Sequence, residues 1–310
     1  MRKVLVIMST YNGEKYIREQ LDSLYGQKDV ELNLLVRDDG SKDNTIEILE
    51  EYSRKYGKMT VVKGKNVGAA RSFHEAAFYA ATRMEPFDYY SYSDQDDVWF
   101  EHKLSTSVRH VDPASSQPQL FYSPALLVDS KLNPIKPNNS RTVNCLGANI
   151  ASSHSLGCTQ VFNKALLDKI VLINGYIASV DTKTYVPLHD AWTALVAYSI
   201  GKVEVGEAPL MFYRQHEANV IGGNDRGIRK FFHRIKRYTS GDKKKSAKCR
   251  IILTLMRDDI PEKNLKLLER CAYYTESFPK RIKLAFTPDL YHYGIADNAG
   301  IFLVILMKQF

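Results

Sequence analysis

The first 110 residues alternate between short apolar runs and stretches whose apolar residues recur at helical spacing. The apolar runs, which predict strands, are residues 3–8, 31–37, 59–63 and 88–93. The amphipathic stretches, which predict helices, are residues 14–25, 45–56, 68–82 and 100–110. This alternation predicts an α/β fold with a mostly parallel central sheet flanked by helices.

The later part of the chain gives a less regular pattern. Residues 120–130 predict one or two strands, and residues 189–200 predict a helix. Residues 202–214 predict paired strands with a turn near Gly206. From about residue 225 the chain becomes basic and mostly helical.

Three predicted strands of the first half end in polar clusters. The clusters are Ser9-Thr10-Tyr11-Asn12, Asp38-Asp39 and Asp94-Gln95-Asp96-Asp97. In open parallel sheets, ligands bind beyond the carboxyl ends of the strands. We therefore expect the three clusters to converge on one ligand-binding crevice.

Composition indicates a globular protein without covalent staples. The chain has 310 residues, of which 44% are hydrophobic and 25% charged, so it can bury a full core. Its cysteines are scattered without a CxxC pair, which predicts free thiols and no zinc site: Cys145, Cys158, Cys249 and Cys271. The first apolar run is too short for a signal peptide, and no window has the ~20 apolar residues of a spanning helix. We expect a cytoplasmic protein without a transmembrane anchor.

The net charge of +8 comes from one segment. Residues 226–250 carry eleven Lys or Arg against one Asp, so the remainder of the chain sums to −2. A solvated surface, an anionic membrane, a nucleic acid or a partner protein would each fit such a segment. Phe231, Phe232 and Ile235 lie at helical neighbour spacing among the basic residues, which favours an anionic membrane surface. No nucleic-acid-binding module is recognised, and residues 301–307 predict a packed helix or a dimer contact.

The Asp94-Gln95-Asp96-Asp97 cluster is the strongest chemical signal. Residues i and i+2 after a strand can both reach one divalent cation, and Mg²⁺ and Mn²⁺ prefer carboxylate oxygens. A solvated acidic turn is the alternative. The preceding apolar-aromatic strand and the nearby Trp99 favour a metal site.

The Asp38-Asp39-Gly40-Ser41 turn has two interpretations. Asp and Ser favour turns and helix caps in any context, and Asp43 or Asn44 can cap the helix that follows. On the same sheet edge as the acidic cluster, however, a carboxylate could accept from a base or ribose. The chain has no GxGxxG after its first strand and no GxxxxGK[ST], so NAD enzymes and P-loop kinases are disfavoured.

Two further clusters occur in the second half. Asp190, in His189-Asp190-Ala191-Trp192, is either a helix cap or a general base. His216, in Tyr213-Arg214-Gln215-His216, is either a surface histidine or a contact to a metal or diphosphate. Arg214 suits phosphate by its geometry.

Together these segments resemble glycosyltransferase family 2, the inverting enzymes with the GT-A fold. The resemblance covers roughly residues 1–222. The motifs that carry it are STYNGEKYI, RDDGSKDNT, NVGAARSF, SDQDDVW, LHDAWTALVA and YRQHEANVIG. It implies a catalytic domain at 1–222, with a nucleotide-sugar half at 1–110 and an acceptor half at 111–222, followed by a basic helical region at 223–310.

The resemblance also implies roles for individual residues. Asp190 is the expected catalytic base, and a Mg²⁺ or Mn²⁺ ion is expected on Asp94, Asp96 and His216. The expected nucleotide-sugar contacts are Ser9, Thr10, Tyr11, Asp39, Asn66, Arg71, Asp94 and Arg214. The expected acceptor contacts are Asp97, Trp99, His189 and Trp192. Ala191 departs from the family pattern, in which two aromatic residues often follow the His-Asp pair, so the shape of the acceptor pocket is left open.

The narrower resemblance is to bacterial rhamnosyltransferases of surface polysaccharide synthesis. It implies transfer of L-rhamnose from dTDP-β-L-rhamnose to a lipid-linked saccharide. A UDP-hexose or UDP-N-acetylhexosamine donor is the rival within the family. A nucleotidyltransferase and a non-catalytic membrane-surface protein are the alternatives of other classes, and a homodimer is left open.

Overall fold

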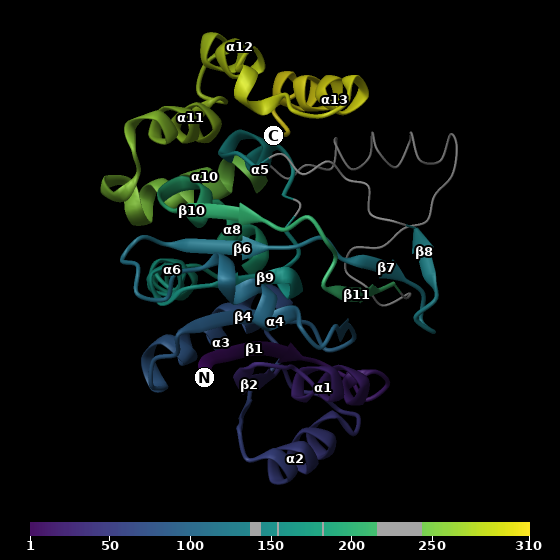
Figure 1. The fold of residues 1–310 in the computed structure, drawn as a ribbon. Coiled ribbons are helices and arrows are strands. Elements are labelled where there is room, and N and C mark those ends of the chain that lie inside the picture. The colour runs from purple at the N-terminus through teal and green to yellow at the C-terminus, as the bar shows by residue number, and fades with distance from the viewer. Residues whose placement is uncertain (137–143, 154, 182, 216–243) are drawn as a thin grey trace. The chain divides into compact units, whose positions relative to one another are not determined.

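The structure is a computed structural model that describes residues 1–136, 144–153, 155–181, 183–215 and 244–310. The chain forms two compact units (Figure 1). Unit 1 comprises residues 1–141, 155–197 and 201–217, and unit 2 comprises residues 142–154, 198–200 and 218–310. The predicted domain boundary at residue 222 lies outside the described residues and stays a prediction.

Unit 1 is built on a seven-stranded mixed sheet. Its strands, in spatial order, are β10 (Lys202–Val205), β6 (Gln119–Tyr122), β9 (Gln160–Phe162), β4 (Tyr89–Ser93), β1 (Arg2–Thr10), β2 (Val30–Asp38) and β3 (Met59–Lys63). Neighbouring strands from β4 to β3 run parallel, whereas β9 runs antiparallel to both β4 and β6. Residues 4–8 of β1 are fully buried, as expected for a parallel strand covered on both faces. The predicted α/β fold with a mostly parallel sheet is confirmed.

Five of the seven helices described in unit 1 lie at predicted positions, whereas two were not predicted. The predicted ones are α1 (Ile17–Tyr25), α2 (Thr45–Tyr56), α3 (Ala69–Arg83), α4 (Lys103–Ser107) and the first nine residues of α8 (His189–Ile200), and the other two are α6 (Lys164–Ile170) and α7 (Ile173–Ser179). Helix α1 begins later than predicted because the Gly13 carbonyl accepts from the backbone N–H groups of Tyr16 and Ile17 in a turn. Asp43, rather than Asn44, caps α2, since its Oδ1 accepts from the Thr45 N–H at 3.1 Å.

A second sheet of unit 1 has four short strands. In spatial order they are β5 (Val98–Trp99), β11 (Met211–Arg214), β7 (Leu126–Val128) and β8 (Pro134–Lys136). The prediction that residues 202–214 form paired strands is wrong. Strand β10 pairs with β6 in the larger sheet, and β11 pairs with β5 and β7 in the smaller one. Two adjacent strand patterns do not specify their partners, and this arrangement brings β11 to the acidic cluster beside β5.

Unit 2 is helical, as predicted for the C-terminal part of the chain. Its helices are α5 (Leu146–Ala151), α10 (Lys244–Met256), α11 (Glu262–Tyr273), α12 (Phe278–Ala285) and α13 (Ile295–Leu306). Residues 301, 304 and 305 of α13 are buried, which confirms the predicted packed helix. Cysteines 145, 158, 249 and 271 are free, as expected. Among the described residues, no helix is long and apolar enough to span a bilayer. Most of the basic segment, residues 226–243, lies outside the described residues.

Candidate active site

The turn after β1 is fixed by side chains from two other strand ends. The Asn12 N–H donates to Ser41 Oγ at 2.9 Å, and Asn12 has a left-handed backbone with φ 49°. The Tyr11 N–H donates to Gln95 Oε1 at 2.9 Å, and Gln95 Nε2 donates to the Tyr11 carbonyl at 3.1 Å. A Cβ atom on Gly13 would lie 2.4 Å from Gln95 Oε1, so only glycine permits this contact. The switch from strand to polar turn therefore joins the three predicted clusters.

Asp38 is a structural carboxylate. It is buried, and its Oδ1 accepts from the N–H groups of Gly40 and Ser41 at 3.0 and 2.9 Å. Its Oδ2 accepts from the hydroxyls of Thr10 at 3.0 Å and Ser41 at 2.5 Å. A carboxylate has about four acceptor positions, and these four bonds fill them. Asp38 therefore holds the turn together.

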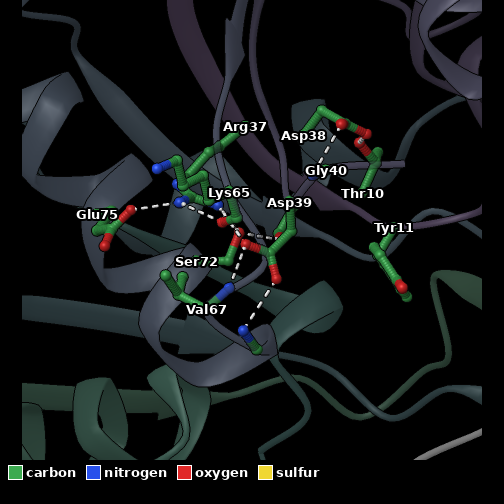
Figure 2. Close-up of polar contacts among 12 residues, drawn as sticks. Thr10, Tyr11, Arg37, Asp38, Asp39, Gly40, Lys65, Val67, Ser72 and Glu75 are labelled. Atoms are coloured by element: carbon green, nitrogen blue, oxygen red, sulfur yellow. Dashed lines mark hydrogen bonds and ion pairs between the residues drawn. The ribbon is translucent and has the colours of Figure 1, made fainter. Parts of the chain in front are cut away.

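Asp39 is also buried but keeps acceptor capacity. Its Oδ1 is bound by Arg37 Nη1 at 2.6 Å and by the Val67 N–H at 2.9 Å, and its Oδ2 accepts from the Gly68 N–H at 2.9 Å. Figure 2 shows these donors around the carboxylate, together with Glu75, whose Oε2 lies 2.5 Å from Arg37 Nη2. These three bonds leave one of about four acceptor positions, on Oδ2.

The acidic cluster after β4 has a different environment. Asp97 is fully buried, and its Oδ1 accepts from the Arg214 N–H at 3.1 Å. Its Oδ2 is also buried, and no described residue forms a hydrogen bond with it. Ligand atoms of Asp94, Asp97 and Cys158 lie within 4.8 Å of one another. The two carboxylates suit a hard divalent cation, which would satisfy the buried oxygen, whereas burial raises the pKa of the Cys158 thiol and leaves it a poor ligand for such an ion.

Proximity and burial change the acidity of this cluster. Burial, together with the charges of Asp96 and Asp190, raises the pKa of Asp94 to about 7. Burial, with the charges of Asp94 and Asp96, raises the pKa of Asp97 well above its usual range. Burial lowers the pKa of the nearby Lys103 ammonium to about 7, although the charges of Cys158 and Asp97 oppose this shift. The cluster therefore holds more negative charge than the described protein groups compensate.

Arg214 is a buried side chain that hydrogen-bonds the backbone of the acidic turn. The side chain is 1% exposed, and its Nε donates to the Asp96 carbonyl at 2.8 Å. Its Nη1 donates to the Ser130 carbonyl at 2.6 Å, and its Nη2 forms an ion pair with Glu19 Oε2 at 2.7 Å. These contacts favour a positioning role for Arg214. Its predicted contact with the donor stays a prediction.

Helix α8 brings His189 and Asp190 to the same strand end. Asp190 Oδ1 accepts from the Ala191 N–H at 2.6 Å, and its charge acts on Asp94. The His189 ring stacks on Phe73 with centroids 3.7 Å apart, and burial lowers its pKa well below the usual value. No described residue bonds to either nitrogen of this ring. The predicted base therefore lies close enough to Asp94, one of the predicted metal ligands, to act on its pKa.

The two tryptophans predicted to contact the acceptor lie in the interior. Trp192 is fully buried, and its Nε1 donates to the Ile170 carbonyl at 3.0 Å. Trp99 is 3% exposed, and its ring lies under the Lys103 ammonium, 3.4 Å from the ring centroid. Burial leaves neither ring a surface on which an acceptor could lie. We therefore propose no acceptor contact for either tryptophan.

The remaining predicted donor contacts lie around the β1 and β2 ends. The Ser9 and Ser72 hydroxyls are 2.5 Å apart, and Tyr11 is an exposed ring at the edge of the turn. Asn66 is exposed just before α3. Arg71 Nη2, in contrast, donates to the Asp181 carbonyl at 2.7 Å. His216 lies outside the described residues, so its predicted metal contact stays a prediction.

Several residues of the site were not identified from the sequence. Gln95 lies inside the acidic motif, but nothing in the sequence indicates that it bonds to Tyr11. Cys158 and Lys103 were not linked to the cluster because they are distant from it in sequence and belong to no motif. Arg37, which precedes the Asp38-Asp39 pair, would be found by asking which cation compensates two buried carboxylates.

Comparison of sequences places this site within a known family. Residues 5–122 match the family model of glycosyl transferase family 2. A dTDP-rhamnosyl transferase, RfbG of Shigella flexneri, is 32% identical over 232 residues, which is 70% of this chain and 74% of that protein. An uncharacterized glycosyltransferase of Rickettsia typhi, RT0329, is 26% identical over 221 residues, which is 69% of this chain and 64% of that protein.

Solved structures share the fold at low sequence identity. Residues 1–349 of S. aureus TarS, in complex with UDP-GlcNAc, match with a TM-score of 0.53 and 18% identity over 99% of this chain and 91% of that one. The mannosyltransferase PcManGT of Pyrobaculum calidifontis, in complex with GDP-Man and Mn²⁺, matches with a TM-score of 0.55 and 18% identity. The latter match covers 100% of this chain and 87% of that one.

Proposed function

We propose a specific reaction for this chain, which belongs to glycosyl transferase family 2 and is a glycosyltransferase that uses a nucleotide-sugar donor. The proposed reaction is inverting transfer of L-rhamnose from dTDP-β-L-rhamnose to a hydroxyl of a lipid-linked saccharide. Similarity to a dTDP-rhamnosyl transferase supports the sugar and the nucleotide. One observation supports the catalytic part above all: Asp190 lies close enough to Asp94 for its charge to raise the pKa of Asp94.

The first two strand ends bind the nucleotide in this proposal. The remaining acceptor position on Asp39 Oδ2 accepts from the N3–H of the pyrimidine base. Tyr11, an exposed ring beside it, contacts the base, while Ser9, Thr10 and Asn66 line the pocket. Asp38 is excluded from donor binding because its four acceptor positions are occupied.

The β4 end holds a Mg²⁺ or Mn²⁺ ion in this proposal. Asp94 and Asp96 are its proposed ligands, with His216 completing the set, and the bound ion would neutralise charge on the diphosphate leaving group. The chain itself positions these groups: Arg214 fixes the backbone at Asp96, and Gln95 ties the acidic turn to the turn after β1. Asp97 assists in this proposal, because a bound ion would also satisfy its buried Oδ2, and it lies too deep to contact the acceptor.

Asp190 is the proposed general base. Its carboxylate takes the proton of the acceptor hydroxyl, and the hydroxyl oxygen forms a bond to the anomeric carbon. The bond between that carbon and the diphosphate oxygen breaks, and dTDP leaves with the electron pair. A single displacement inverts the anomeric centre, so no covalent sugar intermediate forms. His189 precedes the base, and its buried ring stacks on Phe73, so we propose a positioning role for it.

The location follows from the acceptor. A lipid-linked saccharide lies at a membrane, and we place this enzyme at the cytoplasmic face, with residues 226–250 on anionic lipid. The charge of that segment supports this placement.

Donor hydrolysis tests the proposal. The purified chain is incubated with dTDP-rhamnose, UDP-glucose, UDP-galactose or UDP-N-acetylglucosamine, each with Mn²⁺ or EDTA, and released nucleotide is measured. We expect turnover of dTDP-rhamnose only, abolished by EDTA and by Asp96→Ala. Turnover of a UDP-sugar alone would refute the proposed donor.

Matched variants separate the base from the donor site. With a saccharide acceptor, Asp190→Asn should lower kcat by at least about a hundredfold while donor Kd stays unchanged. Asp258→Asn, the same change at an exposed aspartate of unit 2, serves as the control and should keep full activity. Full activity of Asp190→Asn would remove the proposed base.

A further inference from the structure

Helix α13 exposes an apolar stripe. Its exposed residues recur every four positions at Ile295, Ala299 and Leu303, and Met307 continues the series directly after the helix. Ile295 is 91% exposed, Leu303 55% and Met307 54%. The opposite side is apolar and buried, through residues 301, 304 and 305. Soluble proteins normally keep helices that are apolar on all sides in the interior, so this exposed side is atypical.

Helix α12 and the turn after it extend the same surface. Phe278 is 64% exposed, and Phe286 is 69% exposed. The Phe286 ring packs edge-on against Phe302 of α13, with centroids 5.6 Å apart. Helices α12 and α13 lie next to each other (Figure 1). An open groove of about 400 Å³ lies here, lined by Ala285, Phe286, Pro288, Tyr291 and Phe302. We call Phe278, Phe286, Ile295, Leu303 and Met307 the α12–α13 face.

Lysines border this face. Lys280, Lys283 and Lys308 are exposed next to its apolar residues, and Lys280 pairs with Glu276 at 2.5 Å. Residues 278–310 contain four Lys or Arg and two Asp, so the segment is positively charged. Apolar side chains with lysines around them are typical of helices that lie in the headgroup region of an anionic bilayer.

A second copy of the chain is the other occupant to weigh. A twofold dimer would place the same face against itself, and its lysine border would meet lysines of equal charge. An anionic bilayer instead pairs these lysines with lipid phosphates and takes the apolar side chains below the headgroups. Charge complementarity therefore favours lipid.

We propose that the α12–α13 face binds the surface of an anionic bilayer. Helix α13 lies in the plane of the membrane, with Leu303 and Met307 in the boundary between headgroups and acyl chains. This surface is separate from residues 226–250, and the proposal does not depend on the donor or the acceptor, because binding occurs without either.

Vesicle co-sedimentation of the full chain tests this. The vesicles are pure phosphatidylcholine, or phosphatidylcholine with about one third phosphatidylglycerol, at low and high salt. We expect binding to the anionic vesicles. Leu303→Gln/Met307→Gln, which changes no charge, should weaken it about tenfold or more at both salt concentrations. Lys283→Gln/Lys308→Gln should weaken it about tenfold at low salt, with a much smaller loss at high salt.

Three controls keep the result interpretable. Phe78→Ser removes a similarly exposed ring, 45% exposed on α3 of unit 1, and should leave vesicle binding unchanged. Thermal unfolding of every variant should match the parent, because the replaced side chains are exposed. Light scattering reports whether the Leu303→Gln/Met307→Gln variant dissociates a dimer.

Three outcomes would overturn the proposal. These are absence of vesicle binding by the parent, unchanged binding by Leu303→Gln/Met307→Gln, or a dimer that this variant dissociates. None of them bears on donor turnover, which is measured without vesicles.

Discussion

Two strand ends of the same sheet carry clustered carboxylates, and the surrounding protein compensates their charge to different extents. At the end of β2, Asp38 and Asp39 accept seven hydrogen bonds, one of them from the buried Arg37. At the end of β4, Asp97 has an oxygen that no described residue bonds, and the pKa of Asp94 is raised to about 7. The protein supplies the counter-charge at the first end and leaves it to a ligand at the second. Compensated carboxylates build a pocket, whereas uncompensated ones are suited to hold a cation.

The largest expected effect is on stability at the β2 end. Asp39→Ala should lower the free energy of unfolding by about 3 kcal/mol, because the change leaves the Arg37 charge buried with only Glu75 as a carboxylate partner. Urea denaturation measures this. The matched change Glu75→Ala, at a side chain 44% exposed, should cost less than about 1 kcal/mol. Equal losses would mean that Asp39 is not the main counter-charge.

The same kind of change should have the opposite sign at the β4 end. Asp97→Asn should raise the unfolding free energy of the metal-free protein by about 2 kcal/mol at neutral pH, since it removes the cost of burying or protonating this carboxylate beside Asp94 and Asp96. Urea denaturation in EDTA measures the gain. A loss of stability in EDTA would show that the carboxylate of Asp97 is compensated after all.

The pH dependence of stability should further distinguish the carboxylates at the end of β4 from those at the end of β2. The folded pKa of Asp94 is about 7, above the unfolded value of about 4, so between these values the folded state binds more protons. The contribution of Asp94 to the stability of the metal-free protein should therefore be fully present below about pH 4 and be lost as pH rises to about 7. For this half-buried group we expect a decline of about 1–2 kcal/mol.

Asp94→Asn identifies the origin of that decline. Denaturation midpoints from pH 4 to 8, in EDTA, should lose this part of the pH dependence in the variant. An identical pH profile in parent and variant would contradict the assignment to Asp94.

The smallest expected effect concerns the link between the acidic turn and the turn after β1. Gly13→Ala should displace Gln95 from Tyr11, so Gly13→Ala and Gln95→Ala should each raise the donor KM by about three- to tenfold. The double variant should be no worse than either single variant, because both break one contact. Steady-state kinetics on all four proteins provides the test, and additive losses would show that the two residues act independently.

Much of the fold could be predicted because the hydrophobic pattern is regular in the first half. The bounds of α2, β3 and α8 match the predicted ranges, since each has a clear apolar stripe or run. The partners of β10 and β11 could not be predicted, because strand pairing depends on the whole sheet. Gly206 N–H donates to the Tyr122 carbonyl, which continues the β10–β6 pair rather than starting a hairpin.

The residue types of the candidate site were predictable, but it was not predictable which carboxylates the protein itself hydrogen-bonds. The sequence marked both acidic pairs, yet nothing in it distinguishes Asp38, with four donors, from Asp97, with an unbonded oxygen. That distinction comes from Thr10, Ser41 and the Arg214 backbone, which reach the carboxylates through the tertiary fold. Trp99 and Trp192 show the same limit, because aromatic residues beside a motif can belong to the site or to the core.

Calorimetric titration of Mn²⁺ into the protein, with dTDP present, tests the central claim most directly. We predict saturable binding to the parent and to Asp258→Asn, and none to Asp96→Ala. Unfolding curves of all three proteins, taken in EDTA, establish that each is folded before titration. Absence of Mn²⁺ binding by the folded parent, or equal affinity in Asp96→Ala, would contradict the account that the β4 end is left for a cation.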